Sequence, residues 1–343
     1  MSIANKGIPC VLSMMLASPL ALAQEQINIV GSSTVYPFAT VVAERFGKST
    51  HFSVPKIEST GSGGGLKLFC SGVGGNTPDI TNASRKIKSS EIELCKKNGV
   101  NDVIEIQIGY DGIAFANSTK SAQLDVTIKE LYMALAKVLP NEKGDLVDNP
   151  YQTWQQINPD FPNVGIEVLG PPPTSGTRDA FVELVMEAGC DELPAMKALA
   201  KVDSKKHKAA CQGLREDGAF VEAGENDNLI VQKLASNPNA FGIFGYSFLD
   251  QNRDKVQGAK INGVTPSFDA IGDGSYPVSR SLFFYIKKAH VGTVAGLHEY
   301  ALAFTSEDAI GEEGYLTDRG LIPLSEADWK KVRQAAESLT PNL

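Results

Sequence analysis

The chain has 343 residues, which is long enough for two lobes or domains, and 42% of them are hydrophobic, which allows a sizeable core. Its formal net charge of −8, together with the lack of a basic stripe, excludes nucleic acid as a partner. An acidic protein can still bind an anion, provided that local dipoles and buried donors outweigh its overall field.

Residues 1–23 are typical of a cleavable secretory signal. Lys6 is the only charged side chain among them, and the apolar run that follows ends in Ala21-Leu22-Ala23, a small-x-small cleavage pattern. This run is too short and too interrupted by Ser and Pro to form a stable membrane span. We therefore expect an exported, soluble protein located in the periplasm.

The cysteines predict disulfides. Five cysteines become four once Cys10 leaves with the signal, and an even number in an exported chain favours bridges. Local spacing favours the pairs Cys70–Cys95 and Cys190–Cys211, each contributing roughly 3 kcal/mol by restricting the unfolded chain. The alternative is four buried free thiols. No C-x-x-C pair argues for zinc, and no metal or other cofactor is expected.

Strands and helices alternate along the chain, which favours an α/β fold with sheets rich in parallel strands. In the first third, we expect strands at 27–30, 52–57, 79–81 and 103–117, the last as two halves around residues 110–112. Ser33 or Thr34 is expected to cap a helix that runs to Phe46. Further helices are expected at 64–70 and 89–99.

The remainder of the chain continues this alternation. Thr127 and Glu130 form a capping box that opens the next helix, and Ser325 opens the last one. Between them, we expect strands at 165–170 and 240–246, helices at 177–189 and 226–237, and a strand-like run at 276–288.

Three segments share one form, a strand followed by a Ser/Thr/Gly turn and a helix start: Gly31–Thr34, Ser59–Gly64 and Thr174–Arg178. A helix N-terminus offers unpaired N–H groups and about half a positive charge, small residues let an anion approach, and hydroxyls add donors. An ordinary Ser/Thr cap explains any one such turn. Three in one chain predict an oxyanion site.

The second turn belongs to the stretch "STGSGGGLK" at 59–67, which matches neither common nucleotide loop. Leu68 follows Lys67 where a phosphate-binding loop needs Ser or Thr, and Leu66 stands where a dinucleotide loop needs glycine. The alternative is a flexible surface loop. The bare backbone around Ser62 and Gly63 could still cradle an anion.

Arg85 and Arg178 lie close to two of these turns. The ordinary fate of a single arginine is an exposed salt bridge, whereas the functional alternative is a fork placed on two ligand oxygens. Desolvating a small dianion costs many kcal/mol, so a buried site needs many partners. Around eight to ten charge-assisted hydrogen bonds of ~1.5–3 kcal/mol each could leave about −8 kcal/mol, in the micromolar range.

Catalysis is not indicated. None of the histidines, at 51, 207, 290 and 298, lies in the three turns, and neither H-E-x-x-H nor G-x-S-x-G occurs. A secreted phosphatase or hydrolase that used Ser33, Ser62 or Ser175 as its nucleophile would need a base, and the sequence offers none nearby. We therefore expect no enzyme.

At this point the residues resemble a known family, the phosphate-binding periplasmic proteins of Pst-type ABC importers. The resemblance is carried by "GSSTVYPF", "TGSGGGLKLFCSG", "DITNASRKI", "GYDGIAFAN", "TSGTRDAF" and the late "DRGLIPLS". It implies a two-lobed, type II periplasmic-binding-protein fold, in which the ligand lies in the cleft and two crossing strands form the hinge.

The resemblance also implies a ligand set. Ser33 lies in the first turn, and Thr34 and the Val35 N–H match its donors. Ser62, next to Gly63, matches the hydroxyl of the Gly-rich turn. The donors of the second lobe are matched by Ser175, Gly176 and Thr177.

The chain departs from the best-known family pattern, which has an acidic residue at the position of Arg85 and an arginine at the position of Pro171. A branch of the family looks like this chain, with Arg85 and Arg178 in "ASR" and "SGTR". A carboxylate can accept a hydrogen bond from protonated phosphate, and arginine cannot. Asp111 is our candidate for the replacement acceptor, and its alternative role is that of a turn or hinge residue.

The resemblance implies lobe one at 25–112 plus 275–343 and lobe two at 113–274. It implies a monomer that captures inorganic phosphate and delivers it to a membrane ABC permease. The nearest alternative is the same fold binding sulfate or molybdate, followed by the secreted phosphatase or hydrolase and by a surface adhesion role.

Overall fold

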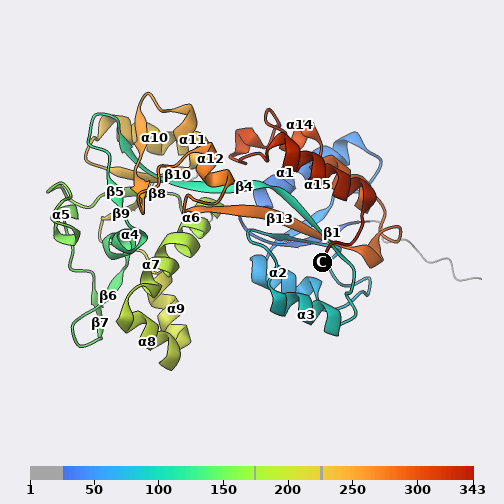
Figure 1. The fold of residues 1–343 in the computed structure, drawn as a ribbon, viewed down its shortest axis with the longest axis horizontal. Helices are drawn as coiled ribbons and strands as arrows, with labels where there is room; N and C mark the ends of the chain where they lie inside the picture. Colours follow the sequence, from blue (N-terminus) through green and yellow to red (C-terminus); the bar gives the residue numbers. More distant parts are fainter. Residues whose placement is uncertain (1–25, 174, 225–226) are drawn as a thin grey trace, which may run out of the picture.

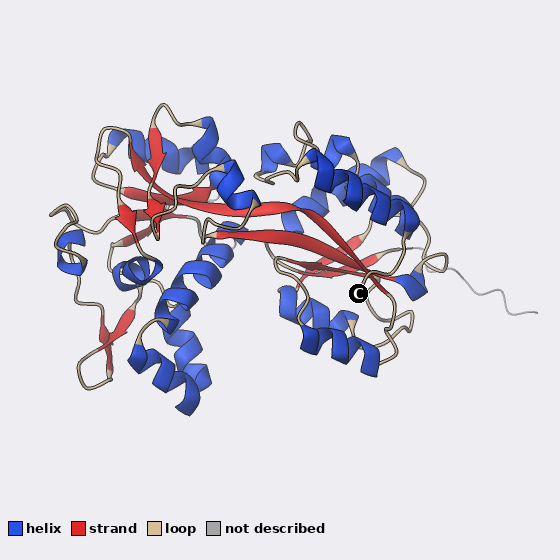
Figure 2. Ribbon diagram, viewed as in Figure 1, coloured by secondary structure: helices blue, strands red, loops and turns tan. Residues whose placement is uncertain are grey.

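The computed structural model describes residues 26–173, 175–224 and 227–343, so the expected signal at 1–23, Cys10 and Thr174 lie outside the described residues. Within these ranges, the chain forms two lobes that are joined by two long strands, as Figures 1 and 2 show. The expected two-lobed α/β fold is confirmed. No helix within the described ranges has the length and apolar character needed to cross a membrane.

The first lobe is a sheet with helices on both faces (Figure 1). Its parallel strands are β1 (Asn28–Gly31), β2 (Lys56–Ser59) and β3 (Ile80–Ala83). Figure 1 places α1 (Tyr36–Ser49), α14 (Glu307–Ile310) and α15 (Glu326–Ser338) on one side, with α2 (Ser62–Phe69) and α3 (Ser89–Lys97) on the other. The lobe also contains α13 (Leu297–Phe304) and 3-10 turns at Lys288–His290 and Thr317–Arg319.

The second lobe contains shorter strands and more helices. Its strands are β5 (Asp125–Val126), β6 (Val138–Pro140), β7 (Leu146–Asp148), β8 (Val168–Gly170), β9 (Phe220–Glu222), β10 (Phe241–Gly245), β11 (Val256–Gly258) and β12 (Lys260–Ile261). Its helices are α4 (Ile128–Leu135), α5 (Trp154–Ile157), α6 (Gly176–Phe181), α7 (Ala188–Asp191), α8 (Pro194–Val202), α9 (Ser204–Gln212), α10 (Asp227–Ser236), α11 (Tyr246–Gln251) and α12 (Phe268–Gly272). A π-helical segment at Val182–Glu187 joins α6 to α7.

The two lobes share the strands β4 (Val103–Ser118) and β13 (Ser279–Lys287), which cross from one to the other side by side (Figure 1). The sheet order is β2-β1-β3-β13-β4-β10-β8-β9, and β11 also pairs with β4. The expected break in 103–117 is wrong, because β4 is one continuous strand. It pairs with β13 as far as Gly112 and with β10 from Ile113, so the partner changes while the backbone stays extended.

Each lobe has its own hydrophobic core. The core of the second lobe gathers buried residues between Ile113 and Val278, with Ile322 added from the end of the chain. In the first lobe, one cluster lies beneath α1, α13 and α15, and a smaller one lies beneath α2 and α3. Motion between the lobes would therefore leave these cores intact and bend mainly the shared strands.

Two disulfides secure helices that bury little apolar surface. Cys70–Cys95 ties the end of α2 to α3, whose only buried residue is Cys95. Cys190–Cys211 ties α7 to α9, which buries only Ala210 and Cys211. These are the pairs that local spacing favours. Because neither α3 nor α9 has a broad apolar face, its disulfide supplies the attachment to the lobe that packing would otherwise provide.

A buried lysine in the first lobe clamps the loop that follows α2. Lys287 is fully buried, and its Nζ donates to Gly72 O and Thr77 Oγ1, each over 2.7 Å. Burial lowers the pKa of Lys287 to about 8, against the opposing charge of Asp79. Because the folded state disfavours the charged form, Lys287 costs stability below about pH 8, and this cost fades as the pH rises toward the ordinary lysine pKa.

We therefore expect the stability of the wild type, relative to Lys287→Met, to increase by about 2 kcal/mol between about pH 7.5 and 9.5. Urea unfolding at several pH values measures this difference. Lys288→Met, at the neighbouring and less buried lysine, is the control for the loss of a lysine side chain at this end of β13. A difference for Lys287→Met that is flat or falls with pH would contradict the expectation.

Candidate functional site

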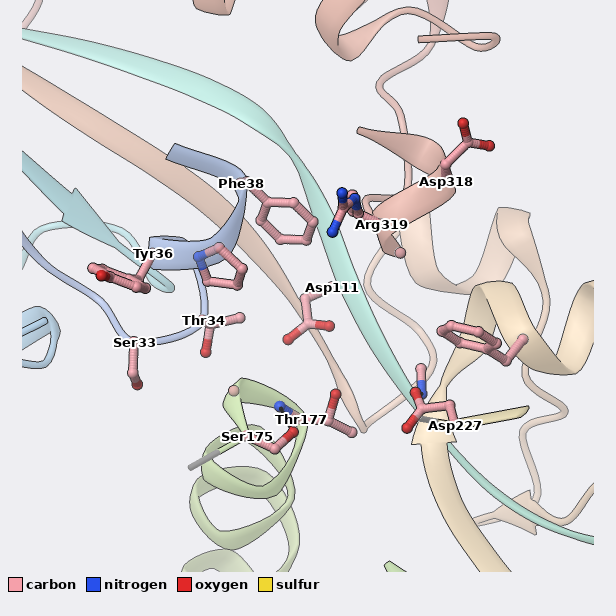
Figure 3. A pocket seen from close by; sticks show the side chains of 15 residues that line it. Ser33, Thr34, Tyr36, Phe38, Asp111, Ser175, Thr177, Asp227, Asp318 and Arg319 are labelled. Atoms are coloured by element: carbon pink, nitrogen blue, oxygen red, sulfur yellow. Dashed lines mark hydrogen bonds between the residues drawn. The ribbon is translucent and has the colours of Figure 1, made fainter. Parts of the chain in front are cut away.

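The three Ser/Thr/Gly turns lie around one cleft between the lobes. A cavity of about 650 Å³ is lined by Ser33, Thr34, Asp111 and the start of α6 at Ser175–Thr177. Figure 3 shows Asp111 beside Thr34, with Ser175 and Thr177 below it in the view. An adjoining cavity of about 510 Å³ shares Ser33 and Thr34 and adds residues of the Gly-rich turn.

In the first turn, the helix cap differs from the expectation. Neither Ser33 nor Thr34 caps α1; instead, Ser32 Oγ accepts from the backbone N–H of Thr34 at 3.2 Å and of Val35 at 3.3 Å. Ser32 is buried and points back into the turn, where it satisfies these donors. The hydroxyls of Ser33 and Thr34 are thereby left to face the cleft.

The Gly-rich turn carries donors on a tightly packed backbone. Gly61 has a φ of 71°, a conformation that other residues avoid, and α2 begins immediately after it at Ser62. Ser62 Oγ lies 3.1 Å from both Ser84 Oγ and the Ser84 N–H, so the turn is tied to the end of β3. At Gly63, a Cβ would meet only Arg85 Nη2, at 3.8 Å, which leaves the backbone open toward the cavity.

Gly65 has a different role, because it lets α2 pack directly on β1. A Cβ there would collide with Gly31 Cα and lie 2.7 Å from Thr81 Oγ1. We expect Gly65→Ala to lower the free energy of unfolding by about 2 kcal/mol, the usual cost of overpacking. Gly64→Ala is the matched control, because its Cβ would come no closer than 3.6 Å to Thr60. Urea denaturation compares them, and equal stabilities would contradict this role.

The third turn brings the second lobe against the first. Ser175 caps α6 and accepts from the Thr177 N–H at 3.2 Å. A Cβ on Gly176 would lie 3.0 Å from Thr34 Cα, so the backbone there closely approaches the first turn. The Ser33 hydroxyl also donates to Asp179 Oδ2 at 2.5 Å. Two of the three turns therefore meet directly across the cleft.

Arg280, which the sequence reasoning missed, lies beside these turns. Its side chain is 7% exposed, and its register on β13 places it opposite Asp111 on β4. Its Nη2 donates to Thr34 Oγ1 at 2.5 Å, and its Nε donates to Asp111 Oδ2 at 3.3 Å. Its place in the strand-like run at 276–288, beside the expected lobe boundary at 275, was the available signal, but the sequence does not reveal the register.

The two arginines expected from the sequence have carboxylate partners. Both amino groups of Arg85 donate to Glu91, at 2.8 and 2.9 Å. Arg178 donates to Glu222 at 3.1 Å and to Pro171 O at 3.2 Å, and its guanidinium lies over the ring of Phe220. Both line the smaller cavity. Arg85 and Arg178 are therefore already neutralised by Glu91 and Glu222, which take the place that an anionic ligand would have beside each guanidinium.

Asp111 is a buried carboxylate at the wall of the larger cavity. Burial raises its pKa above the ordinary aspartate value, and the charge and hydrogen bond of Arg280 oppose this rise. Its carboxylate in Figure 3 is directed toward Thr34 and the start of α6. It is therefore placed where it could accept a hydrogen bond from a ligand in the cleft.

Among the described residues, neither cavity is lined by a histidine. Within the same ranges, the only side-chain group with metal-ligand spacing is Cys190, His207 and Cys211, and both of its sulfur atoms belong to a disulfide. Arg319, Asp318 and Asp227 also line the larger cavity and were not anticipated. The chemistry of the cleft is thus that of hydroxyls, backbone amides, carboxylates and arginine.

Comparison with known proteins identifies the class. A family model described as the PBP superfamily domain matches residues 17–308, so the chain belongs to this superfamily of substrate-binding proteins. Protein SphX of Synechococcus elongatus is 31% identical over 287 residues, covering 80% of this chain and 74% of that protein. Phosphate-binding protein PstS of Staphylococcus saprophyticus is 28% identical, covering 90% of this chain and 83% of that protein.

Solved structures agree on the fold. The chain is similar to a possible phosphate-binding protein from Planctomyces limnophilus, with a TM-score of 0.73, 25% identity, and coverage of 92% of this chain and 99% of that one. An ABC-type phosphate transport receptor from Vibrio cholerae gives a TM-score of 0.57 at 20% identity, covering 87% and 99%. The resemblance expected from the motifs is thereby confirmed at the level of the family.

Proposed function

We propose that this protein captures inorganic phosphate in the cleft between its lobes and delivers it to a membrane ABC permease. The observation that carries the proposal is the meeting of the first and third turns beside the buried Arg280, with the Gly-rich turn on the adjoining cavity. Relatives named PstS, with 28% identity across most of the chain, support phosphate as the ligand.

The proposed ligand set combines neutral donors with one acceptor. The neutral donors are the hydroxyls and amides of the three turns, of which the Thr34 and Val35 amides already donate to Ser32 Oγ: Ser33, Thr34, Val35, Ser62, Gly63, Ser175, Gly176 and Thr177. Arg280 joins the set through its contact with Thr34, and Asp111 is the acceptor for a phosphate proton. Arg85 and Arg178 remain in the set as outer charges, because both line the smaller cavity while bound to glutamates.

Binding and release follow from the two-lobed architecture. The donors come from both lobes, so a bound anion favours closure, and bending of β4 and β13 accounts for the motion. We propose lobe one as 25–112 plus 275–343 and lobe two as 113–274, with support from a second-lobe core that begins at Ile113 and extends a few residues past 274, to Val278. Docking to the permease would reopen the lobes and release the ion.

The location and the assembly of the protein follow from the same proposal. The protein acts in the periplasm after its signal is removed, functions as a monomer, and neither catalyses a reaction nor uses a cofactor. The signal pattern of residues 1–23 and the two disulfides support export.

Calorimetry on protein refolded from denaturant, which removes carried-over ligand, tests the function. Phosphate, sulfate and molybdate are titrated between about pH 5 and 8, and we expect micromolar or tighter binding of phosphate and much weaker binding of the others. If sulfate or molybdate bound more tightly than phosphate, that ion would be assigned as the ligand in place of phosphate. Turnover of a phosphate ester that is lost in both Ser62→Ala and Ser175→Ala would instead indicate a hydrolase.

A further inference from the structure

Every nitrogen of the Arg280 guanidinium has a partner in the cleft. Besides Thr34 and Asp111, its Nη1 donates to Glu183 Oε2 at 2.6 Å. Asp111 lies on β4 directly opposite Arg280 on β13, whereas Glu183 comes from the π-helical segment of the second lobe. Glu183 is therefore the one carboxylate partner that can leave without disturbing the hinge strands.

Solvent exposure also distinguishes the two carboxylate partners of Arg280 and again makes Glu183 the one that can leave. The Asp111 side chain is 13% exposed, and that of Glu183 is 50% exposed. A carboxylate that is half in water exchanges an ion pair for hydration at little cost, while a buried guanidinium left without a counter-charge is expensive. Arg280 is thus paired with a carboxylate that can readily return to water.

A second carboxylate, from α6 immediately before the π-helical segment, also accepts a hydrogen bond from a first-lobe residue of the cleft. Asp179, four residues before Glu183, accepts from the Ser33 hydroxyl at 2.5 Å. Glu183 also contributes to raising the pKa of Arg85, after the larger contribution of the hydrogen bond that Arg85 donates to Glu91. Carboxylate oxygens of the second lobe therefore meet cationic and hydroxyl donors that line the same cleft.

We propose that Glu183 is an internal counter-anion: its carboxylate occupies Nη1 of Arg280 until phosphate takes its place. This inference rests on the proposed function, because it names phosphate as the competing anion. Glu183 neutralises Arg280 before phosphate binds and opposes phosphate binding by a fixed amount. It thereby sets the affinity low enough for release, and it excludes weakly binding monovalent anions that cannot displace a carboxylate.

Calorimetric titration of Glu183→Gln with inorganic phosphate tests the proposal. We expect binding roughly three- to tenfold tighter than in the wild type, because the carboxylate that competes with phosphate for Arg280 Nη1 is removed. Glu187→Gln is the matched control: it removes the same charge four residues further along, where Glu187 accepts from Gln212 instead of an arginine. It should change the phosphate affinity by less than about twofold.

Two further variants separate a specific contact from a structural effect. Glu183→Asp keeps the charge and shortens the side chain, so it should also bind phosphate more tightly than the wild type. In an Arg280→Gln background, Glu183→Gln should give no gain, since its effect acts through Arg280. Circular dichroism verifies folding of each variant.

The outcomes are distinct. Weaker or unchanged phosphate binding by both Glu183 variants would overturn the counter-anion role, because it would make Glu183 a positioning partner of Arg280. An equal gain in Glu187→Gln would also overturn it, since the effect would then be one of overall charge. If the wild type itself does not bind phosphate, the proposed function fails and this inference with it, whereas phosphate binding without the Glu183 effect overturns the inference alone.

Discussion

Arg280→Gln is expected to weaken phosphate binding by about a hundredfold or more. Each charge-assisted hydrogen bond that a ligand forms contributes ~1.5–3 kcal/mol, and a guanidinium can form two of them in parallel. Arg280 is 7% exposed and its carboxylate neighbours are Asp111 and Glu183, so a neutral replacement leaves a net negative wall facing the anion. Calorimetry on refolded protein measures the loss.

The control for this variant is Arg253→Gln, which removes an arginine from an exposed pair with Asp250. It should leave phosphate affinity within about twofold of the wild type. Thermal unfolding of both variants shows whether the fold survives. If Arg280→Gln bound phosphate as tightly as the wild type, Arg280 would not belong to the ligand set. Arg85 and Arg178 would then be the leading candidates for the arginines that bind phosphate.

Asp111→Asn is expected to abolish most of the preference for phosphate over sulfate, with the affinity ratio falling by about a hundredfold. The carboxylate accepts a hydrogen bond from the protonated oxygen of hydrogen phosphate, and it repels sulfate, which carries no proton at neutral pH. Asparagine offers donors to both ions, so phosphate loses a charge-assisted bond of ~1.5–3 kcal/mol while sulfate gains a partner. Titrations with both ions near pH 8, where both are dianions, measure the ratio.

Asp318→Asn is the matched control for the Asp111 variant. Asp318 lines the same cavity, but Figure 3 shows its carboxylate directed away from Asp111 and the turns. Its neutralisation removes one unit of charge without touching the proposed acceptor. A similar loss of discrimination in both variants would mean that overall charge, and not the acceptor at Asp111, decides between the ions.

The local elements are well predicted from the sequence. The capping box of Thr127 and Glu130 forms as expected at the start of α4, and Ser325 caps α15. The strand–turn–helix form of the three turns is present, and both disulfides join the cysteines that are close in sequence. Each of these features depends on hydrogen bonds or links between residues near one another along the chain, which sequence patterns encode directly.

The partners of the charged residues could not be predicted in this way. Arg280 and Asp111 are 169 residues apart in sequence, and they meet because the antiparallel pairing of β4 and β13 sets them opposite each other. A shift of this register by one residue would turn the Arg280 side chain to the other face of the sheet. Likewise, the hydroxyl that accepts from the Thr34 and Val35 N–H groups in the turn before α1 is that of Ser32, because the path of the turn directs this hydroxyl inward.

What the sequence by itself determined is the inventory: three donor turns at helix starts, two local disulfides, an α/β alternation and a recognisable family. Only the tertiary structure decided which charges face the cleft. It set Arg280 there and gave Arg85 and Arg178 their glutamate partners. The physical reason is that backbone donors follow local conformation, whereas the pairing of long charged side chains depends on strand register and lobe packing between distant parts of the chain.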